Sequence, residues 1–316
     1  MRAARALTRV LACTSAASAL VAGVSPARAL SLRGGRSAAL MSTAVAAPEA
    51  PVEKFRKDYA APPYRIDSLT LNFDIHEEET LVTASLAIER AAGTAVGVPM
   101  ELDGEDLDLR AIDIDGTALA AGEGYALGAK EGLTLLSPPA GDKFTLTTTV
   151  AIKPQENTQL SGLYKSSGNY VTQCEAEGFR RITFFQDRPD VMATYRVRVE
   201  ADKAAYPLLL SNGNEIGSGD CDGGGRHYAE FEDPHRKPSY LFALVAGKLE
   251  GVESTFTTCS GRAVRLAVWS EAENIDQLDW AMQSLKDAMT WDEKTYGREY
   301  DLDVYHIVAV NDFNMG

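Results

Sequence analysis

The densest group of side chains capable of chemistry lies in TQCEAEGFRRITFFQDRPDV, residues 172–191, which holds one thiol, four acids and three arginines beside an aromatic pair. Carboxylates and guanidinium groups at this density form charge-assisted hydrogen bonds, either with one another or with an ionic ligand. Taken without context, an acid such as Glu175 is most often a solvated surface residue. The composition of this segment alone therefore indicates ion pairing, and a ligand site needs further support.

Common catalytic and metal-binding motifs are missing from the sequence. The single His-Glu pair, at 76–77, lacks the second histidine that an H-E-x-x-H motif requires at position 80. The stretch GDCDGGGRHYAEF, residues 219–231, begins like a calcium loop but places Gly224 and Phe231 at ligand positions, so we interpret it as a turn. No G-x-S-x-G motif or Cys/His nucleophile arrangement is found. We therefore expect no catalytic residue and no metal ligand in this chain.

The elements around these residues are predicted to be strands. From 69 to 75 and from 82 to 88, apolar side chains alternate with polar ones, which predicts a hairpin with one buried face. Similar alternation recurs at 144–152, and the apolar run SYLFALVAG, 239–247, predicts a strand buried on both faces. Residues from about 60 to 250 therefore indicate one all-β domain.

The end of the chain has a different pattern. From Asn274, apolar residues recur at helical spacing and predict a helix that ends at Gly297, with Asn274 and Gln277 imitating a capping box. VYHIVAV, residues 304–310, predicts a short buried strand. A helix and two strands cannot cover both faces of one another, so we interpret this α/β unit as incomplete.

Composition limits the classes of function. The chain has 316 residues, of which 45% are hydrophobic and 24% charged, values typical of a globular protein with room for two folded units. A net charge of −14 repels nucleic acid and anionic lipid surfaces, so we expect no nucleic-acid partner. Cys174, Cys221 and Cys259 show no C-x-x-C spacing and are interpreted as free thiols.

The amino terminus is predicted to be a targeting segment. Residues 1–48 contain six arginines and no Lys, Asp or Glu, so they carry +6 while the remainder carries −20. An apolar stretch, Val10–Val24, precedes Ala27-Arg28-Ala29, which fits a secretory signal with its cleavage site and is too short to span a membrane comfortably. The Arg- and Ser-containing residues 30–47 then have the composition of a transit peptide. We expect delivery to an organelle, a plastid in particular, with the mitochondrion or secretion as alternatives, and no membrane span after targeting.

Several ordered segments resemble one protein family. They are TQCEAEGFRRITFFQDRPDV, SNGNEIGSG, DPHRKPSYLFALVAG, WAMQSLKDAMTWDEKTYGREYDLDVYHIVAV and NDFNMG. From about residue 60 to the last residue, the chain resembles the amino-terminal portion of the aminopeptidase N family, zinc metalloaminopeptidases of the gluzincin type in their bacterial and organellar form. The resemblance implies a mainly β fold, with a saddle-like β-sandwich domain followed by the truncated start of an α/β, thermolysin-like catalytic domain. We accordingly expect a targeting segment at 1–48, the β domain at 49–250 and an incomplete catalytic domain at 251–316.

The resemblance also implies a substrate-binding set. Gln173 and Glu175 match the residues that bind the free α-amino group of a peptide, Met315 matches a residue that lines the pocket for the first side chain, and Gly316 matches a glycine whose backbone lies along the substrate. A carboxylate that holds an ammonium group selects peptide ends, because an internal peptide bond offers no cation. The resemblance further implies a cis peptide bond between Glu175 and Ala176.

The remaining residues of 172–191 are expected to be structural. We expect ion pairs for Glu177, Arg180 and Arg181, and a turn at the DRPD sequence, 187–190, because Pro fixes φ and Asp favours turn starts. The adjacent pair Phe184 and Phe185 is expected to pack in the core and at its rim.

Two functions remain open on the sequence. The first is the amino-terminal fragment of a metalloaminopeptidase that removes amino-terminal residues from peptides; by resemblance, zinc in the full-length enzyme activates a water and a Glu acts as general base, while this chain binds no zinc. The second is a non-catalytic β-domain binding or scaffold protein derived from that family. Retention of Gln173, Glu175 and Met315 favours the first, and the absence of zinc ligands from the sequence stands against it.

Overall fold

The computed structural model describes residues 53, 55–128 and 132–313. The chain divides into two compact units, Met1–Asp58 and Tyr59–Gly316. The described part of the first unit includes a short 3-10 helix, η1 (Arg56–Asp58). The predicted targeting segment, 1–48, lies outside the described residues. The second unit is mainly β.

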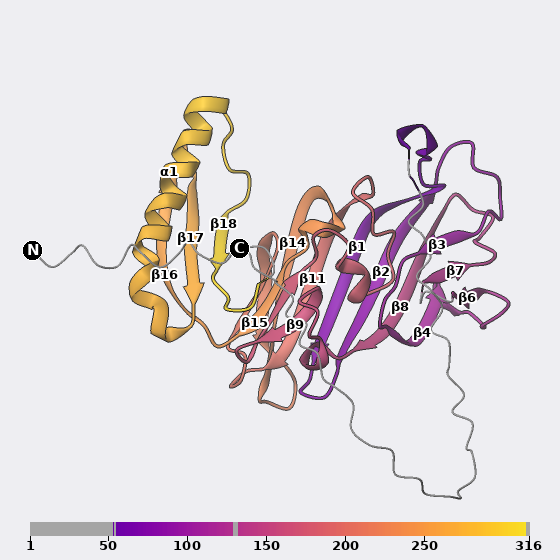
Figure 1. Ribbon diagram of the computed structural model, residues 1–316, viewed down its shortest axis with the longest axis horizontal. Helices are drawn as coiled ribbons and strands as arrows, with labels where there is room; N and C mark the ends of the chain where they lie inside the picture. Colours follow the sequence, from indigo (N-terminus) through magenta and orange to yellow (C-terminus); the bar gives the residue numbers. More distant parts are fainter. Residues whose placement is uncertain (1–52, 54, 129–131, 314–316) are drawn as a thin grey trace, which may run out of the picture. The chain divides into compact units, whose positions relative to one another are not determined.

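The largest sheet has eight strands in the order β13-β14-β11-β1-β2-β8-β4-β5, within which β1 and β11 pair in parallel and all other neighbours are antiparallel (Figure 1). The predicted hairpin is confirmed, since Leu71 of β1 lies opposite Ala84 of β2 and both side chains are fully buried. The strands of this sheet are β1 (Tyr64–Ile75), β2 (Thr80–Arg90), β4 (Asp108–Ile114), β5 (Thr117–Ala118), β8 (Lys143–Ile152), β11 (Met192–Asp202), β13 (Asn214–Asp220) and β14 (Arg226–Pro238).

Two smaller sheets complete the β region. One has four strands in the order β12-β15-β10-β9, and the other has three in the order β3-β7-β6. Their strands are β9 (Gly162–Ser166), β10 (Asn169–Gln173), β12 (Leu208–Ser211), β15 (Leu244–Gly247), β3 (Met100–Leu102), β7 (Leu133–Leu135) and β6 (Tyr125–Leu127). Short 3-10 helices connect them: η2 (Pro154–Glu156), η3 (Phe179–Arg181) and η4 (Ser239–Leu241). The glycine-rich stretch 221–225 is the turn between β13 and β14, as predicted.

The prediction of one continuous strand at 239–247 is wrong in its first half, because Ser239–Leu241 form η4. Phe242 is 3% exposed and its ring stacks 5.9 Å from that of Phe73, whereas Leu241 is 49% exposed. The chain must therefore change direction at η4 before β15 can join the four-stranded sheet.

An aromatic cluster fixes the start of η3. The Phe179 ring makes edge-to-face contacts with Phe185 at 5.2 Å, Phe242 at 5.3 Å and Tyr195 at 6.3 Å. Such pairs contribute beyond the area they bury. Because Phe179 directly follows the turn 174–178, this cluster holds one end of that turn.

A separate sheet, β16-β17-β18, carries helix α1 along one face (Figure 1). Its elements are β16 (Glu250–Thr257), β17 (Ala263–Ser270), η5 (Ala272–Gln277), α1 (Leu278–Tyr296) and β18 (Val304–Val308). A second cluster of buried apolar side chains joins β17 to α1: Val264, Leu266, Val268, Leu278, Met282, Leu285 and Met289. No helix in the described ranges is both long and apolar enough to cross a membrane.

The end of helix α1 is predicted correctly, whereas the capping box predicted at its start is not formed. Gly297 adopts a left-handed conformation with φ 61° and donates from its backbone to Glu293, so α1 ends there as predicted. The capping box is wrong, because Gln277 donates its side-chain amide to the Asn274 side chain at 3.2 Å, within η5. The buried strand predicted at 304–310 is also wrong in its burial, since β18 is an edge strand whose residues are all half-buried.

Candidate functional site

Strand β10 ends at Gln173, the first of the predicted site residues. Gln173 lies opposite Gly162 of β9 and is 6% exposed. Its side-chain Nε2 donates a 3.2 Å hydrogen bond to the backbone carbonyl of Glu175. A buried amide must satisfy its hydrogen bonds, so this contact fixes the Gln173 side chain against the turn that follows.

The turn 174–178 is short and closed. The backbone of Gly178 donates to the carbonyl of Cys174 at 2.8 Å. Cys174 and Gly178 are buried, whereas Glu175, Ala176 and Glu177 between them are exposed. The Glu175-Ala176 peptide bond is cis, as predicted. The turn is closed by a hydrogen bond between its two ends, and it exposes the carboxylates of Glu175 and Glu177 to solvent.

The two carboxylates have different surroundings. Glu177 Oε1 lies 3.5 Å from a guanidinium nitrogen of Arg180. Within the residues that the structure describes, no ion pair or hydrogen bond of the Glu175 carboxylate is found. Glu175 therefore remains available to an external cation, while Glu177 is already partly neutralised.

A buried carboxylate supports the far end of the turn. Asp187 is 3% exposed and accepts hydrogen bonds from the backbone and Nε of Arg180, both at 3.1 Å, and from the Ser239 hydroxyl at 2.5 Å. Burial raises the pKa of Asp187, and the hydrogen bonds from Ser239 and Arg180 oppose that rise. The sequence predicts Asp187 only as part of a turn, because nothing in its local pattern points to Ser239.

Most of the structural roles expected nearby are confirmed. Arg181 pairs with Glu105 and, at 2.7 Å, with Asp106, which completes the expected ion pairs of Glu177, Arg180 and Arg181. Phe184 and Phe185 are 1% and 0% exposed, so both lie in the core and the expected rim position is wrong. A turn occupies 189–190, at the end of the DRPD sequence. Burial also raises the pKa of the Cys174 thiol, so this cysteine is not a thiolate nucleophile at neutral pH.

The other two predicted site residues, Met315 and Gly316, lie outside the described residues. The chain just before them is described, and Asp312 is hydrogen-bonded to Tyr164 and Ser166 of β9, the strand that pairs with β10. The sequence does not predict the hydrogen bonds of Tyr164 and Ser166 to Asp312. No local signal could have found them, because their partner is about 150 residues away along the chain.

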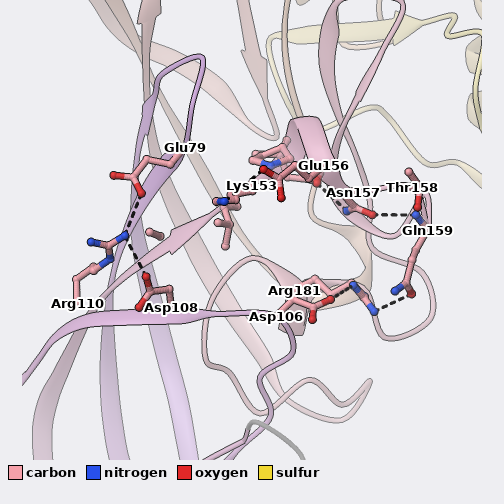
Figure 2. A pocket seen from close by; sticks show the side chains of 14 residues that line it. Glu79, Asp106, Asp108, Arg110, Lys153, Glu156, Asn157, Thr158, Gln159 and Arg181 are labelled. Carbon is pink, nitrogen blue, oxygen red and sulfur yellow. Dashed lines mark hydrogen bonds and ion pairs between the residues drawn. The ribbon is translucent and has the colours of Figure 1, made fainter.

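A pocket of about 350 Å³ lies between the end of β8, η2 and β9 (Figure 2). It contains neither Gln173 nor Glu175. Its charged side chains pair with one another: Arg110 with Glu79 and Asp108, Lys153 with Glu156, and Arg181 with Asp106. This mutual pairing gives the pocket no evident ligand, and we assign it no function.

Among the described residues, no group of three or more His, Cys, Asp or Glu side chains is placed to hold a metal ion. The described residues therefore do not fit zinc, and we assign no catalytic step to them.

The chain is similar to known proteins over most of its length. Residues 67–241 match the family described as Peptidase M1 N-terminal domain. The chain is 52% identical to aminopeptidase N of Caulobacter vibrioides over 82% of this chain and 29% of that protein, and 46% identical to aminopeptidase N of Escherichia coli over 84% of this chain and 30% of that protein. A crystal structure of Legionella pneumophila aminopeptidase A in complex with aspartic acid superposes with a TM-score of 0.77 at 32% identity, over 82% of this chain and 30% of that one. The chain thus spans about three tenths of the length of these relatives.

Proposed function

Because the chain belongs to the peptidase M1 family through its N-terminal domain, we propose that it supplies the part of a metalloaminopeptidase that recognises the free amino terminus of a peptide. The observation that carries this proposal is the exposed Glu175 carboxylate, held on a closed turn beside the buried amide of Gln173. An ammonium group bound there would form a charge-assisted hydrogen bond.

In this proposal the chain's own contribution is recognition. Gln173 holds the backbone of the turn, and Glu175 accepts hydrogen bonds from the substrate's ammonium group. Acetylation of the peptide removes that positive charge, so a blocked peptide leaves the carboxylate without a partner. Zinc belongs, in this proposal, to the full-length enzyme and not to the residues described here.

Binding by the 316-residue chain tests the proposal directly. Alanyl-alanine amide and its N-acetylated form would be titrated into the protein and followed by NMR chemical shifts, which detect weak binding. We expect the free peptide to bind more tightly than the acetylated one. Glu175→Gln should reduce this preference by about ten- to hundredfold, because hydrogen bonds to charged groups contribute roughly 1.5–3 kcal/mol.

Glu177→Gln is the matched control, because it removes a carboxylate two residues away that already faces Arg180. It should leave the preference for free peptides unchanged. Equal binding of free and acetylated peptides by the unmodified chain would contradict the proposal and favour a scaffold role. A companion assay would follow release of the first residue from alanyl and arginyl amides, with and without a zinc chelator, using the longest product of the gene.

We also propose that residues 1–48 direct the protein to an organelle, a plastid in particular. Support comes from their +6 charge, their lack of acids and the signal-like apolar stretch Val10–Val24. A fluorescent protein fused after residue 48 should enter that organelle, and a fusion that begins at residue 49 should not. Identical distributions of the two fusions would contradict this targeting role.

A further inference from the structure

The Arg180 guanidinium lies beside the turn that carries Glu175, and a buried carboxylate holds it there. The Arg180 side chain is only 21% exposed. Its Nε donates to Asp187 Oδ2 at 3.1 Å, and its Nη2 donates to the Asp187 backbone carbonyl at 3.2 Å. The Arg180 backbone nitrogen donates to the same Oδ2, also at 3.1 Å. Asp187 therefore fixes both the backbone and the side chain of Arg180.

The outer edges of this guanidinium face two other acids. Nη1 lies 3.8 Å from Asp103 Oδ1, and Nη2 lies 3.5 Å from Glu177 Oε1. Both separations are longer than the contacts to Asp187, and both acids are far more exposed than Asp187. Exposed ion pairs contribute little, so these two acids hold the side chain less firmly than Asp187 does. Among the described residues, no ion pair joins Arg180 to Glu175.

Asp187 is itself held by contacts that do not involve Arg180. The Ser239 hydroxyl, at the start of η4, donates to Asp187 Oδ1 at 2.5 Å. The Asp187 backbone nitrogen donates to Asp103 Oδ2 at 3.0 Å. Asp103 in turn exchanges two backbone hydrogen bonds with Phe185, at 2.8 and 3.1 Å. The position of Asp187 therefore does not depend on Arg180 alone.

A guanidinium released from Asp187 has an exposed carboxylate close by. Arg180 already lies beside Glu177, and the Cα atoms of Glu175 and Glu177 are at most about 7 Å apart because they are two residues apart along the chain. Glu175 is exposed, and no partner of its carboxylate is found within the described part of the chain. An Arg180 side chain that is free to turn outward therefore reaches a second carboxylate with which it can form an exposed ion pair.

We propose that Asp187 is a positioning residue that keeps the Arg180 guanidinium away from Glu175 and so leaves that carboxylate open to the ammonium group of a peptide. This inference rests on the proposed function. Without the Asp187 charge, Arg180 competes with the peptide for Glu175, since both cations bind the same carboxylate. This role differs from support of the turn, because the loss that it predicts depends on the Arg180 charge and is reversed when that charge is removed.

The test compares a single variant with a double variant. Alanyl-alanine amide and its N-acetylated form would be titrated into each 316-residue chain and followed by NMR chemical shifts. Asp187→Asn keeps the shape of the side chain and an acceptor for Ser239 but removes the charge. It should weaken binding of the free peptide about two- to fivefold, the effect of one exposed ion pair. The double variant Asp187→Asn with Arg180→Met also removes the competing cation and should restore the wild-type Kd.

Two controls separate competition by Arg180 from loss of structure. Ser239→Ala removes a buried hydrogen bond of the same Asp187 carboxylate but leaves its charge, and should keep the wild-type Kd. Arg181→Met, added to Asp187→Asn, removes the neighbouring arginine, which pairs with Glu105, and should not restore binding. Urea unfolding of every variant, measured in parallel, shows which of them are folded.

The possible failures can be told apart. Equal binding of free and acetylated peptides by the wild type overturns the proposed function and this inference with it. A wild type that prefers free peptides, together with an Asp187→Asn variant of unchanged Kd, overturns this inference alone. A double variant that binds as weakly as Asp187→Asn, or equal restoration by Arg181→Met, also overturns it. If Asp187→Asn does not fold, Asp103→Asn loosens the same guanidinium from a more exposed position, and an unchanged Kd in that variant likewise overturns the inference.

Discussion

The indole Nε1 of Trp269 donates a 3.1 Å hydrogen bond to Nδ1 of His306, which lies on the neighbouring strand β18. The His306 ring must therefore be neutral at Nδ1 to accept it. Burial lowers the pKa of His306, and the positive charge of Arg265 lowers it further. The stability of the β16-β17-β18 sheet therefore depends on pH through the hydrogen bond between Trp269 and His306.

The chain should lose stability as the pH falls from about 7.5 to about 5. The unfolded chain protonates His306 near pH 6.5, whereas the folded chain does so only at lower pH. Over that interval the unfolded state binds more protons, so the unfolding free energy falls with falling pH. Urea unfolding at the two pH values should show a smaller difference for His306→Gln. His235→Gln, which replaces an exposed imidazole, is the control and should keep the wild-type difference.

Breaking the buried ion pair between Lys237 and Asp233 should be strongly destabilising. Their charged atoms lie 3.0 Å apart, the two residues are 8% and 7% exposed, and the Lys237 ammonium also lies 3.7 Å from the centre of the Tyr195 ring. Lys237→Met leaves Asp233 buried without its cation, and we expect a loss of about 3–5 kcal/mol in urea unfolding.

Removing both charges of this pair gives a sharper comparison. The double variant Lys237→Met with Asp233→Asn leaves no uncompensated charge and should recover a large part of the stability lost by Lys237→Met. A double variant as unstable as the single one would contradict the role of the ion pair.

Gly178→Ala should displace the turn that carries Glu175. An added Cβ would lie 2.5 Å from the Gln173 carbonyl and 2.9 Å from the Gly162 nitrogen, and these backbone atoms cannot move independently of their strands. We expect a loss of about 1–3 kcal/mol in stability and weaker binding of free amino termini. Gly217→Ala, where the Cβ meets nothing within 4 Å, should change neither property.

Alkylation should rank the three cysteines of the described residues by exposure. Cys259 is exposed, Cys221 is half-buried and Cys174 is buried with a raised pKa. Only a thiolate reacts readily, so iodoacetamide should modify Cys259 first and leave Cys174 intact in the folded chain. Mass spectrometry of peptides after timed labelling measures this order. Early modification of Cys174 would mean that the turn 174–178 opens in solution.

Local sequence patterns predicted the elements whose stability depends on near neighbours. Alternating apolar residues predicted β1 and β2, because burial of one face requires a period of two. Gly297 predicted the end of α1, because a left-handed residue ends a helix at little cost when it has no side chain. The start of α1 was mispredicted because Ala272–Gln277 form η5, in which Gln277 bonds the Asn274 side chain. The strand at 239–247 was mispredicted because Phe242 packs against the distant Phe73.

The sequence by itself determined which residues are candidates for recognition, because Gln173 and Glu175 match the family in the segment TQCEAE. The charged residues around them led us to expect ion pairs. Only the tertiary structure decided that Asp312 is bonded to Ser166. The physical reason is that a hydrogen bond between residues nearly 150 positions apart depends on strand register and sheet order, which arise from packing of the whole unit and leave no mark on the sequence near either partner.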